Sequence, residues 1–120
     1  MAQVLAFVDD LLFQSKIAET ARQCGVAVKF VGSPATLAAE AVLHSAALVV
    51  VDLNARNGPL EAIRDLQAAS PGRQVIAFLS HVQVELAAQA RASGCTEVLP
   101  RSKFTLLLPE LLQRAKTGQP

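Results

Sequence analysis

The sequence contains no tryptophan, no tyrosine and only two cysteines among its 120 residues. Cys24 and Cys95 lie far apart in the chain, which excludes the paired spacing of a zinc site or a thioredoxin-like redox motif. Positive and negative charges are also nearly equal in number, with 11 Lys and Arg and 10 Asp and Glu. A net charge of +1 argues against a direct nucleic-acid binder, which normally carries a basic surface.

Long apolar runs are also absent, although 52% of the residues are hydrophobic. The longest runs have the length of a strand, so we expect no membrane-spanning helix and no membrane partner. Residues 1–4 lack the positive region and cleavage site of a secretion signal, so we expect a cytoplasmic protein. The length and the hydrophobic content predict one domain, 1–120, that buries its own core.

Short β-branched runs alternate with longer segments rich in Ala, Leu, Glu, Arg and Gln. The predicted strands are Val4–Val8, Val26–Val31, Ala47–Val51, Gln74–Leu79 and Thr96–Leu99. The predicted helices are Leu11–Cys24, Pro34–His44, Pro59–Ala69, Val82–Ser93 and roughly Thr105–Lys116. Five strand–helix units in succession, with right-handed crossovers, predict the α/β class. We expect a doubly wound, five-stranded parallel sheet in the order 2-1-3-4-5, with helices on both faces.

Residues with special backbone preferences mark several helix ends. Ser33 and Pro34 supply a capping hydroxyl and a proline at the first helical position. Gly25 and Gly94 stand just after predicted helices, where a left-handed residue is favoured. Pro109 must lie in the first turn of the last helix or kink it, because a deeper proline removes a hydrogen bond and clashes with the preceding turn.

Polar residues follow the strands at the edge of the sheet where parallel strands end. They are Asp9 and Asp10 after the first strand, Asp52 after the third, Ser80 after the fourth and Arg101 after the fifth. Sheets of this kind bind ligands at that edge, between strands 1 and 3. Three neighbouring carboxylates need a cation, and oxygen ligands with open water positions suit Mg²⁺. A hydroxyl and a guanidinium would complete a pocket for a phosphoryl group, with Asp52 as the nucleophile.

Four segments resemble the receiver domain of bacterial response regulators, the CheY-like superfamily. They are Val4–Asp10, Leu48–Asn54, Val75–Ser80 and Ala92–Leu99. The segments follow the family's order, and the resemblance covers the whole chain.

The resemblance implies a role for each matching residue. Asp9 and Asp10 correspond to the acidic pair that holds Mg²⁺. Asp52 corresponds to the phosphoacceptor, which also contacts the metal, and Asn54 to the residue whose backbone carbonyl reaches it. Ser80 corresponds to the switch hydroxyl that turns toward the aspartyl phosphate.

The resemblance also implies a function and partners. The chain would be the receiver of a two-component system, phosphorylated on Asp52 by a histidine kinase or phosphotransfer protein. Its own chemistry would be limited to self-phosphorylation and autodephosphorylation. Phosphorylation would switch the face formed by the fourth helix, fifth strand and fifth helix, where a downstream effector protein or a second copy of the chain would bind.

Other positions depart from the family pattern and favour an alternative. Arg101 replaces a lysine, Ser102 the proline after it, and Val98 the switch aromatic. Ala55 and Arg56 replace a Met-Pro pair. Arginine is a larger, planar group and is not interchangeable with lysine at a tight phosphate site. The alternative is an atypical receiver that is never phosphorylated and serves as a protein-interaction module.

Simpler interpretations stay open beside these. Asp9 and Asp10 could cap the first helix, and Ser80 could cap the fourth, with Gln83 completing a capping box. A flavodoxin-like enzyme or cofactor-binding protein is a third class of function. The sequence argues against it, because Asp9 and Asp10 would repel a flavin phosphate and no Trp or Tyr is available for stacking.

Overall fold

Strands and helices alternate along the chain in the computed structural model, which describes residues 2–80 and 83–117. The strands are β1 (Val4–Phe7), β2 (Val28–Phe30), β3 (Leu48–Asp52), β4 (Val75–Leu79) and β5 (Glu97–Pro100). The helices are α1 (Leu11–Cys24), α2 (Pro34–His44), α3 (Pro59–Ala69), α4 (Val84–Ser93) and α5 (Arg101–Thr117). All strand pairs are parallel and the order is β2-β1-β3-β4-β5, which confirms the predicted doubly wound sheet.

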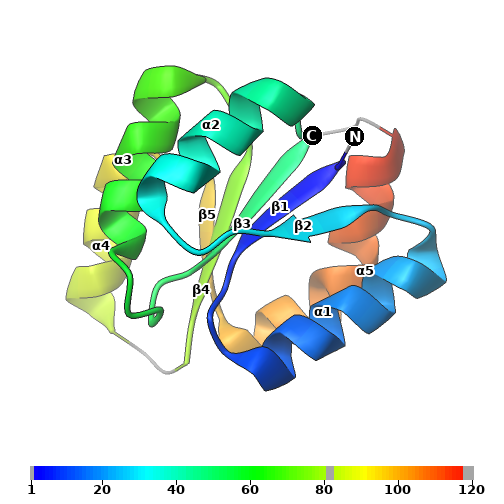
Figure 1. Cartoon of the computed structure of the whole chain (residues 1–120). Helices are drawn as coiled ribbons and strands as arrows, with labels where there is room; N and C mark the ends of the chain where they lie inside the picture. The colour runs from blue at the N-terminus through cyan, green and yellow to red at the C-terminus, as the bar shows by residue number, and fades with distance from the viewer. Residues whose placement is uncertain (1, 81–82, 118–120) are drawn as a thin grey trace.

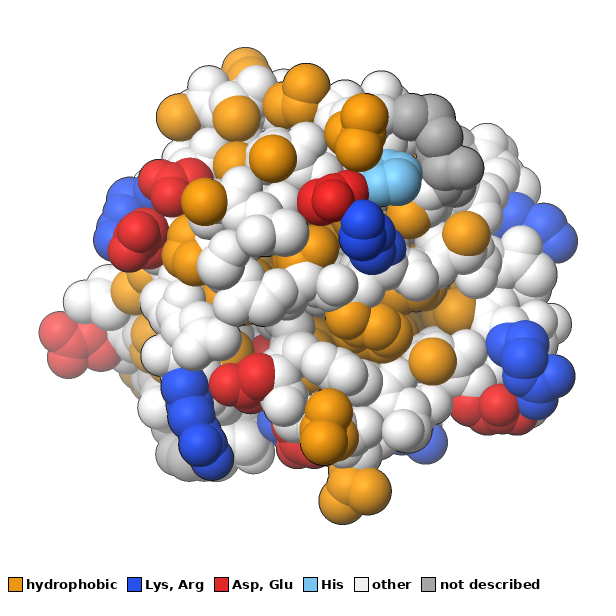
Figure 2. Space-filling view, in the orientation of Figure 1, with side chains coloured by type: hydrophobic (Ala, Val, Ile, Leu, Met, Phe, Trp, Pro, Cys, Tyr) orange, Lys and Arg blue, Asp and Glu red, His pale blue; other side chains and the backbone are white. Residues whose placement is uncertain are grey.

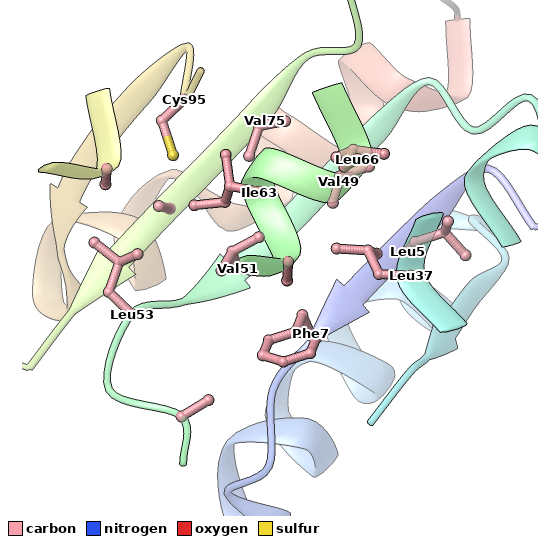
Figure 3. Close-up of a cluster of buried hydrophobic side chains, with 14 of the residues drawn as sticks. Leu5, Phe7, Leu37, Val49, Val51, Leu53, Ile63, Leu66, Val75 and Cys95 are labelled. Carbon is pink, nitrogen blue, oxygen red and sulfur yellow. The ribbon is translucent and has the colours of Figure 1, made fainter. Parts of the chain in front are cut away.

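Helices cover both faces of the sheet (Figure 1). α2, α3 and α4 pack on one face, and α1 and α5 pack on the other. Figure 3 shows the first of these apolar layers, in which Leu5, Val49 and Val75 of the strands meet Leu37 of α2 and Ile63 of α3. Every residue of β3 and β4 is buried, as their unbroken apolar runs predict for central strands.

Three phenylalanines form the centre of the layer beneath α1 and α5. The rings of Phe78 and Phe104 stack with their centroids 4.6 Å apart, and the Phe13 ring lies 4.9 Å from that of Phe78. These residues come from α1, β4 and α5. Their packing therefore fixes the starts of both helices against the carboxyl end of β4.

The largest departure from the sequence prediction is at the fifth helix. α5 begins at Arg101, directly after β5, rather than near Thr105. Pro109 consequently lies inside the helix, beyond its first turn, so of the two predicted alternatives, a place in the first turn or a kink, the first is wrong. The proline supplies no N–H to the carbonyl of Thr105, and its own ring is exposed to solvent.

The start of the fourth helix also bears on the site. The structure begins α4 at Val84 with Gln83 as its N-cap, and no side-chain hydrogen bond caps it among the described residues. The predicted start, Val82, lies outside the described residues. Ser80 is therefore not the N-cap of this helix. The predicted cap at Ser33 is confirmed, because its hydroxyl accepts a backbone N–H of α2 at 3.1 Å.

No helix in ranges 2–80 and 83–117 is both long and apolar enough to cross a membrane. On the face shown in Figure 2, charged side chains of both signs are scattered, with apolar side chains between them. This face therefore offers no continuous surface of one charge.

Candidate functional site

The carboxyl ends of β1 and β3 and the start of α5 surround one open pocket of about 620 Å³. Its lining consists of Asp9, Asp10, Asp52, Asn54, Arg56, Asn57 and Arg101. The structure thus brings together five of the residues that the sequence predicted for the site. The sixth, Ser80, does not belong to the described lining of this pocket.

Asp52 is the last residue of β3, and only 2% of its surface is exposed. Its Oδ1 accepts the backbone N–H of Asn54 at 2.9 Å, and its Oδ2 lies 3.6 Å from Arg101 Nη2. Burial raises the pKa of Asp52, while the Asn54 N–H and the Arg101 charge act in the opposite direction. A carboxylate buried to this degree requires a nearby cation when it is ionised.

Asp10 is the N-cap of α1. Its Oδ1 accepts the backbone N–H groups of Leu12 at 3.0 Å and Phe13 at 3.2 Å, which confirms the capping interpretation for this residue. Its Oδ2 accepts a hydrogen bond from Arg101 Nη1 at 3.3 Å. The Phe13 N–H and then Arg101 hold the pKa of Asp10 below its usual value. Both carboxylate oxygens are therefore engaged by N–H donors.

Asp9 is exposed and connects two loops of the site. Its Oδ2 accepts the backbone N–H of Arg56 at 3.0 Å, so it ties the end of β1 to the loop that follows β3. Asp9 does not cap α1, since that position belongs to Asp10. The sequence did not predict the Arg56 contact, because it depends on the path of a loop rather than on a side-chain pattern.

Arg101 places a cation between two of the acids. Its guanidinium reaches Asp10 and Asp52, and its central carbon lies 4.6 Å from the ring centroid of Phe13 and 5.5 Å from that of Phe78. A guanidinium placed over an aromatic ring at such a distance makes a favourable cation–π contact. The chain itself therefore supplies a cation to two of the three carboxylates, Asp10 and Asp52.

These contacts bear on the predicted Mg²⁺ site. Within the described part of the chain, no group of three His, Cys, Asp or Glu residues is placed to hold a metal ion. Mg²⁺ prefers free carboxylate oxygens in near-octahedral geometry. Here both oxygens of Asp10 accept N–H groups, and Oδ2 of Asp52 faces the guanidinium. This arrangement does not fit Mg²⁺, whose binding stays a prediction that requires Arg101 to move.

The Asn54 side chain has a role that the sequence did not predict. Its Oδ1 accepts the backbone N–H of Ser80 at 2.7 Å, and its Nδ2 donates to Gln83 Oε1 at 2.9 Å. Asn54 therefore links the ends of β3 and β4 to the start of α4. The available signal was an Asn two residues after a strand, in a loop where its side chain commonly bonds to nearby backbone.

No protein-family model matches the sequence, and no curated protein matches it either. Solved structures do match it. The chemotaxis protein CheY4 of Vibrio cholerae is 20% identical with a TM-score of 0.81, over 96% of this chain and 98% of that one. The receiver domain of NarL from Mycobacterium tuberculosis is 16% identical with a TM-score of 0.76, over 96% of each chain.

A third match is a protein of Burkholderia pseudomallei described as pilus assembly-related. It is 21% identical with a TM-score of 0.75, over 100% of this chain and 92% of that one. At these identities the likeness concerns the fold. The strand order, the helix placement and these matches show that the chain has the CheY-like fold of response regulator receiver domains.

Proposed function

We propose that this chain is an atypical receiver, a protein-interaction module that works without phosphorylation. The observation that carries the proposal is the position of Arg101, 3.3 Å from Asp10 and 3.6 Å from Asp52. Arginine stays charged in proteins, so the pocket has its counter-ion at all times. Asp10 and Asp52 therefore have a cation beside them without any bound metal.

The contacts of Asp52 support the same proposal. One of its oxygens accepts the Asn54 N–H, and the other faces Arg101. A phosphoryl group on Asp52 would require the guanidinium to leave its place over Phe13. Such a stack contributes about 0.5–2 kcal/mol, and part of it would be lost. The pocket is therefore arranged for stability rather than for repeated group transfer.

The partner in this proposal is a protein that binds the face of α4, β5 and α5. Two large apolar side chains on this part of the chain are exposed, Val84 of α4 at 75% and Leu106 of α5 at 81%. Val98 of β5 packs on the α4 side of the sheet and stands in place of a switch aromatic. An interaction face without that ring does not need a phosphorylation-dependent movement to become accessible.

A second candidate function is the phosphorylated receiver of a two-component system. It is favoured by the pocket that Asp9, Asp10 and Asp52 share, which opens to solvent. In this candidate, a histidine kinase or phosphotransfer protein phosphorylates Asp52, and the carboxylates of Asp9, Asp10 and Asp52 would hold Mg²⁺ once Arg101 had turned outward.

One experiment separates the two candidates. The protein is incubated with Mg²⁺ and acetyl phosphate, and its intact mass is measured, beside Asp52→Asn and the control Asp65→Asn, which changes an exposed carboxylate on α3. We expect no mass gain for any of the three. A gain of one phosphoryl group in the parent and in Asp65→Asn, but not in Asp52→Asn, would overturn the proposal and support the second candidate.

A further inference from the structure

The loop between β3 and α3 contains the one Asn-Gly pair of the sequence, Asn57 and Gly58. An asparagine loses its side-chain amide when the backbone nitrogen of the next residue attacks the side-chain carbonyl carbon. Glycine in the next position hinders that attack least, because it has no Cβ. The same loop holds the only other asparagine of the chain, Asn54, which is followed by Ala55. The two asparagines can therefore be compared directly.

The attacking nitrogen is held at Ala55 and free at Gly58. The N–H of Ala55 donates to the carbonyl of Asp52 at 3.1 Å. The N–H of Gly58 forms no hydrogen bond with any residue in 2–80 or 83–117. A bonded N–H must first break its hydrogen bond before its nitrogen can act as a nucleophile. The attack is therefore easier at Gly58 than at Ala55.

The side-chain amide is also held more loosely at Asn57 than at Asn54. Asn54 Oδ1 accepts the N–H of Ser80 at 2.7 Å, and its Nδ2 donates to Gln83 Oε1 at 2.9 Å. Asn57 forms one side-chain hydrogen bond within the described residues, from its Nδ2 to the carbonyl of Gly32 at 2.9 Å. One exposed hydrogen bond slows the release of an amide by about two- to tenfold, so it delays the reaction without preventing it.

The backbone around this pair has few restraints. The last described backbone N–H before α3 that forms a hydrogen bond is that of Arg56, which donates to Asp9. The N–H of Asn57 has no partner in 2–80 or 83–117, and Pro59, the first residue of α3, has no N–H. Segments with few hydrogen bonds open locally at low cost. The side chain of Asn57 is exposed, so water reaches it.

We propose that Asn57 is a site of spontaneous deamidation. The nitrogen of Gly58 bonds to Cγ of Asn57, the Cγ–Nδ2 bond breaks, and Nδ2 leaves as ammonia with the proton that the Gly58 nitrogen gives up. The product is a cyclic succinimide, which one water molecule opens. Opening at Cγ gives an aspartate, and opening at the main-chain carbonyl carbon gives an isoaspartate. The sequence of steps consumes water, releases ammonia and requires no oxidant, reductant or enzyme.

The modification changes the acidic pocket, because Asn57 lines it together with Asp9, Asp10 and Asp52. A carboxylate at position 57 adds one more negative charge to this lining. It also cannot donate a hydrogen bond to the carbonyl of Gly32. The modified chain therefore loses the contact between the loops that precede α2 and α3, and its pocket attracts cations more strongly. This inference does not depend on the proposed function.

The test follows the full chain at neutral pH over time by tryptic digestion and mass spectrometry. Trypsin cuts after Arg56, so Asn54 and Asn57 fall in separate peptides. A sample digested at time zero sets the background, and isoaspartate is detected with an isoaspartyl methyltransferase and a labelled methyl donor. Asn57 should convert at least about tenfold faster than Asn54, which must break two more hydrogen bonds.

A synthetic peptide of residues 54–61 serves as the clock. Asn57 in the full chain should convert about two- to tenfold more slowly than in this peptide, because the bond to Gly32 must open first. The rate in the full chain should rise with pH, since the attacking nitrogen loses its proton.

A matched pair of variants tests the role of the glycine. Gly58→Ala should slow the conversion of Asn57 severalfold, whereas Gly72→Ala should leave it unchanged. Both glycines have positive φ, and a Cβ at either position would meet no atom closer than 3.7 Å, so the two variants carry similar strain. Loss of stability alone would open the loop and speed the reaction, so it cannot imitate the expected slowing.

Three outcomes would overturn the inference. They are an unmodified Asn57 in a full chain sampled after more than ten times the period in which the peptide converts, equal conversion at Asn54 and Asn57, and conversion of Gly58→Ala at the rate of the parent. If Gly58→Ala does not fold, the comparison of the two asparagines in the parent still decides.

Discussion

Arg101→Ala removes the cation that two acids share, and its cost can be worked out from the contacts. Leaving the buried Asp52 without this partner costs about 1–3 kcal/mol. Loss of the stack on Phe13 and Phe78 costs about 0.5–2 kcal/mol, and loss of the half-exposed pair with Asp10 about 0–1 kcal/mol. Because these contributions overlap, we expect a total loss of about 2–3 kcal/mol.

Thermal unfolding followed by circular dichroism at pH 7 measures this loss. A chain of this size has an unfolding entropy of about 0.25 kcal/mol/K, so Tm should fall by about 8–12 °C. The Tm of Arg101→Lys should lie between those of the parent and Arg101→Ala, because lysine keeps the positive charge but loses the stack of the guanidinium on the rings. Arg22→Ala, which breaks the exposed pair with Glu19, should change Tm by less than about 2 °C.

The pH dependence of Arg101→Ala has a defined sign. Removing the cation moves the pKa of Asp52 in the folded protein further above its value in the unfolded chain. A group with a raised pKa destabilises the fold when it ionises, so the stability difference between Arg101→Ala and the parent should grow as pH rises from 4 to 8. A Tm within about 2 °C of the parent at pH 7 would show that the guanidinium is not the counter-ion of Asp52.

Three further variants test single contacts. Asp52→Asn removes a carboxylate whose pKa is raised by burial, and such a group destabilises the fold when it is ionised. The Tm of this variant should therefore be higher than that of the parent at pH 7, and the gain should vanish below about pH 4. A lower Tm at pH 7 would contradict this. Asp10→Ala removes the cap of α1 and should cost about 1 kcal/mol in urea unfolding at pH 7. Since the pKa of Asp10 is lowered, that cost should fade as pH drops below about 4, and unchanged urea midpoints would speak against the cap. Gly94→Ala should lower the free energy of unfolding more than Gly72→Ala in the same assay. Both glycines have positive φ, but only a Cβ at position 94 would lie 2.5 Å from Gln67 Cγ. Equal losses of stability in the two variants would refute this clash.

The sequence allowed three helices to be predicted to the residue, namely Leu11–Cys24, Pro34–His44 and Pro59–Ala69. Each has a recognisable end, such as the Ser33 hydroxyl before a proline. β2 is shorter than predicted because this edge strand pairs with only one neighbour, β1, over Val28–Phe30. Hydrophobicity indicates which residues favour a strand, whereas the neighbouring strand determines where the pairing ends.

The start of α5 could not be predicted in the same way. No capping side chain precedes it, since Arg101 follows Pro100 of β5 directly, and Pro109 indicated a later start. Tertiary packing of Phe104 into the aromatic cluster fixes this turn instead. That contact joins α5 to β4, which local sequence cannot show.

Topology placed the acids and Arg101 at one edge of the sheet, so these members of the pocket could be predicted, whereas Arg56 and Asn57, which also line it, could not. The choice between a cap and a metal ligand for Asp10 could not, because it depends on α1 beginning at the next residue, Leu11. The orientation of Arg101 depends on the rings of Phe13 and Phe78, which other elements supply.

Calorimetric titration with Mg²⁺ tests whether the counter-ion of the acidic pocket is the Arg101 guanidinium or a metal ion. The parent protein should show no saturable binding at millimolar Mg²⁺, and Arg101→Ala, in which the acids lose their counter-ion, should gain it. Saturable Mg²⁺ binding by the parent that disappears in Asp52→Ala would contradict the role assigned to Arg101.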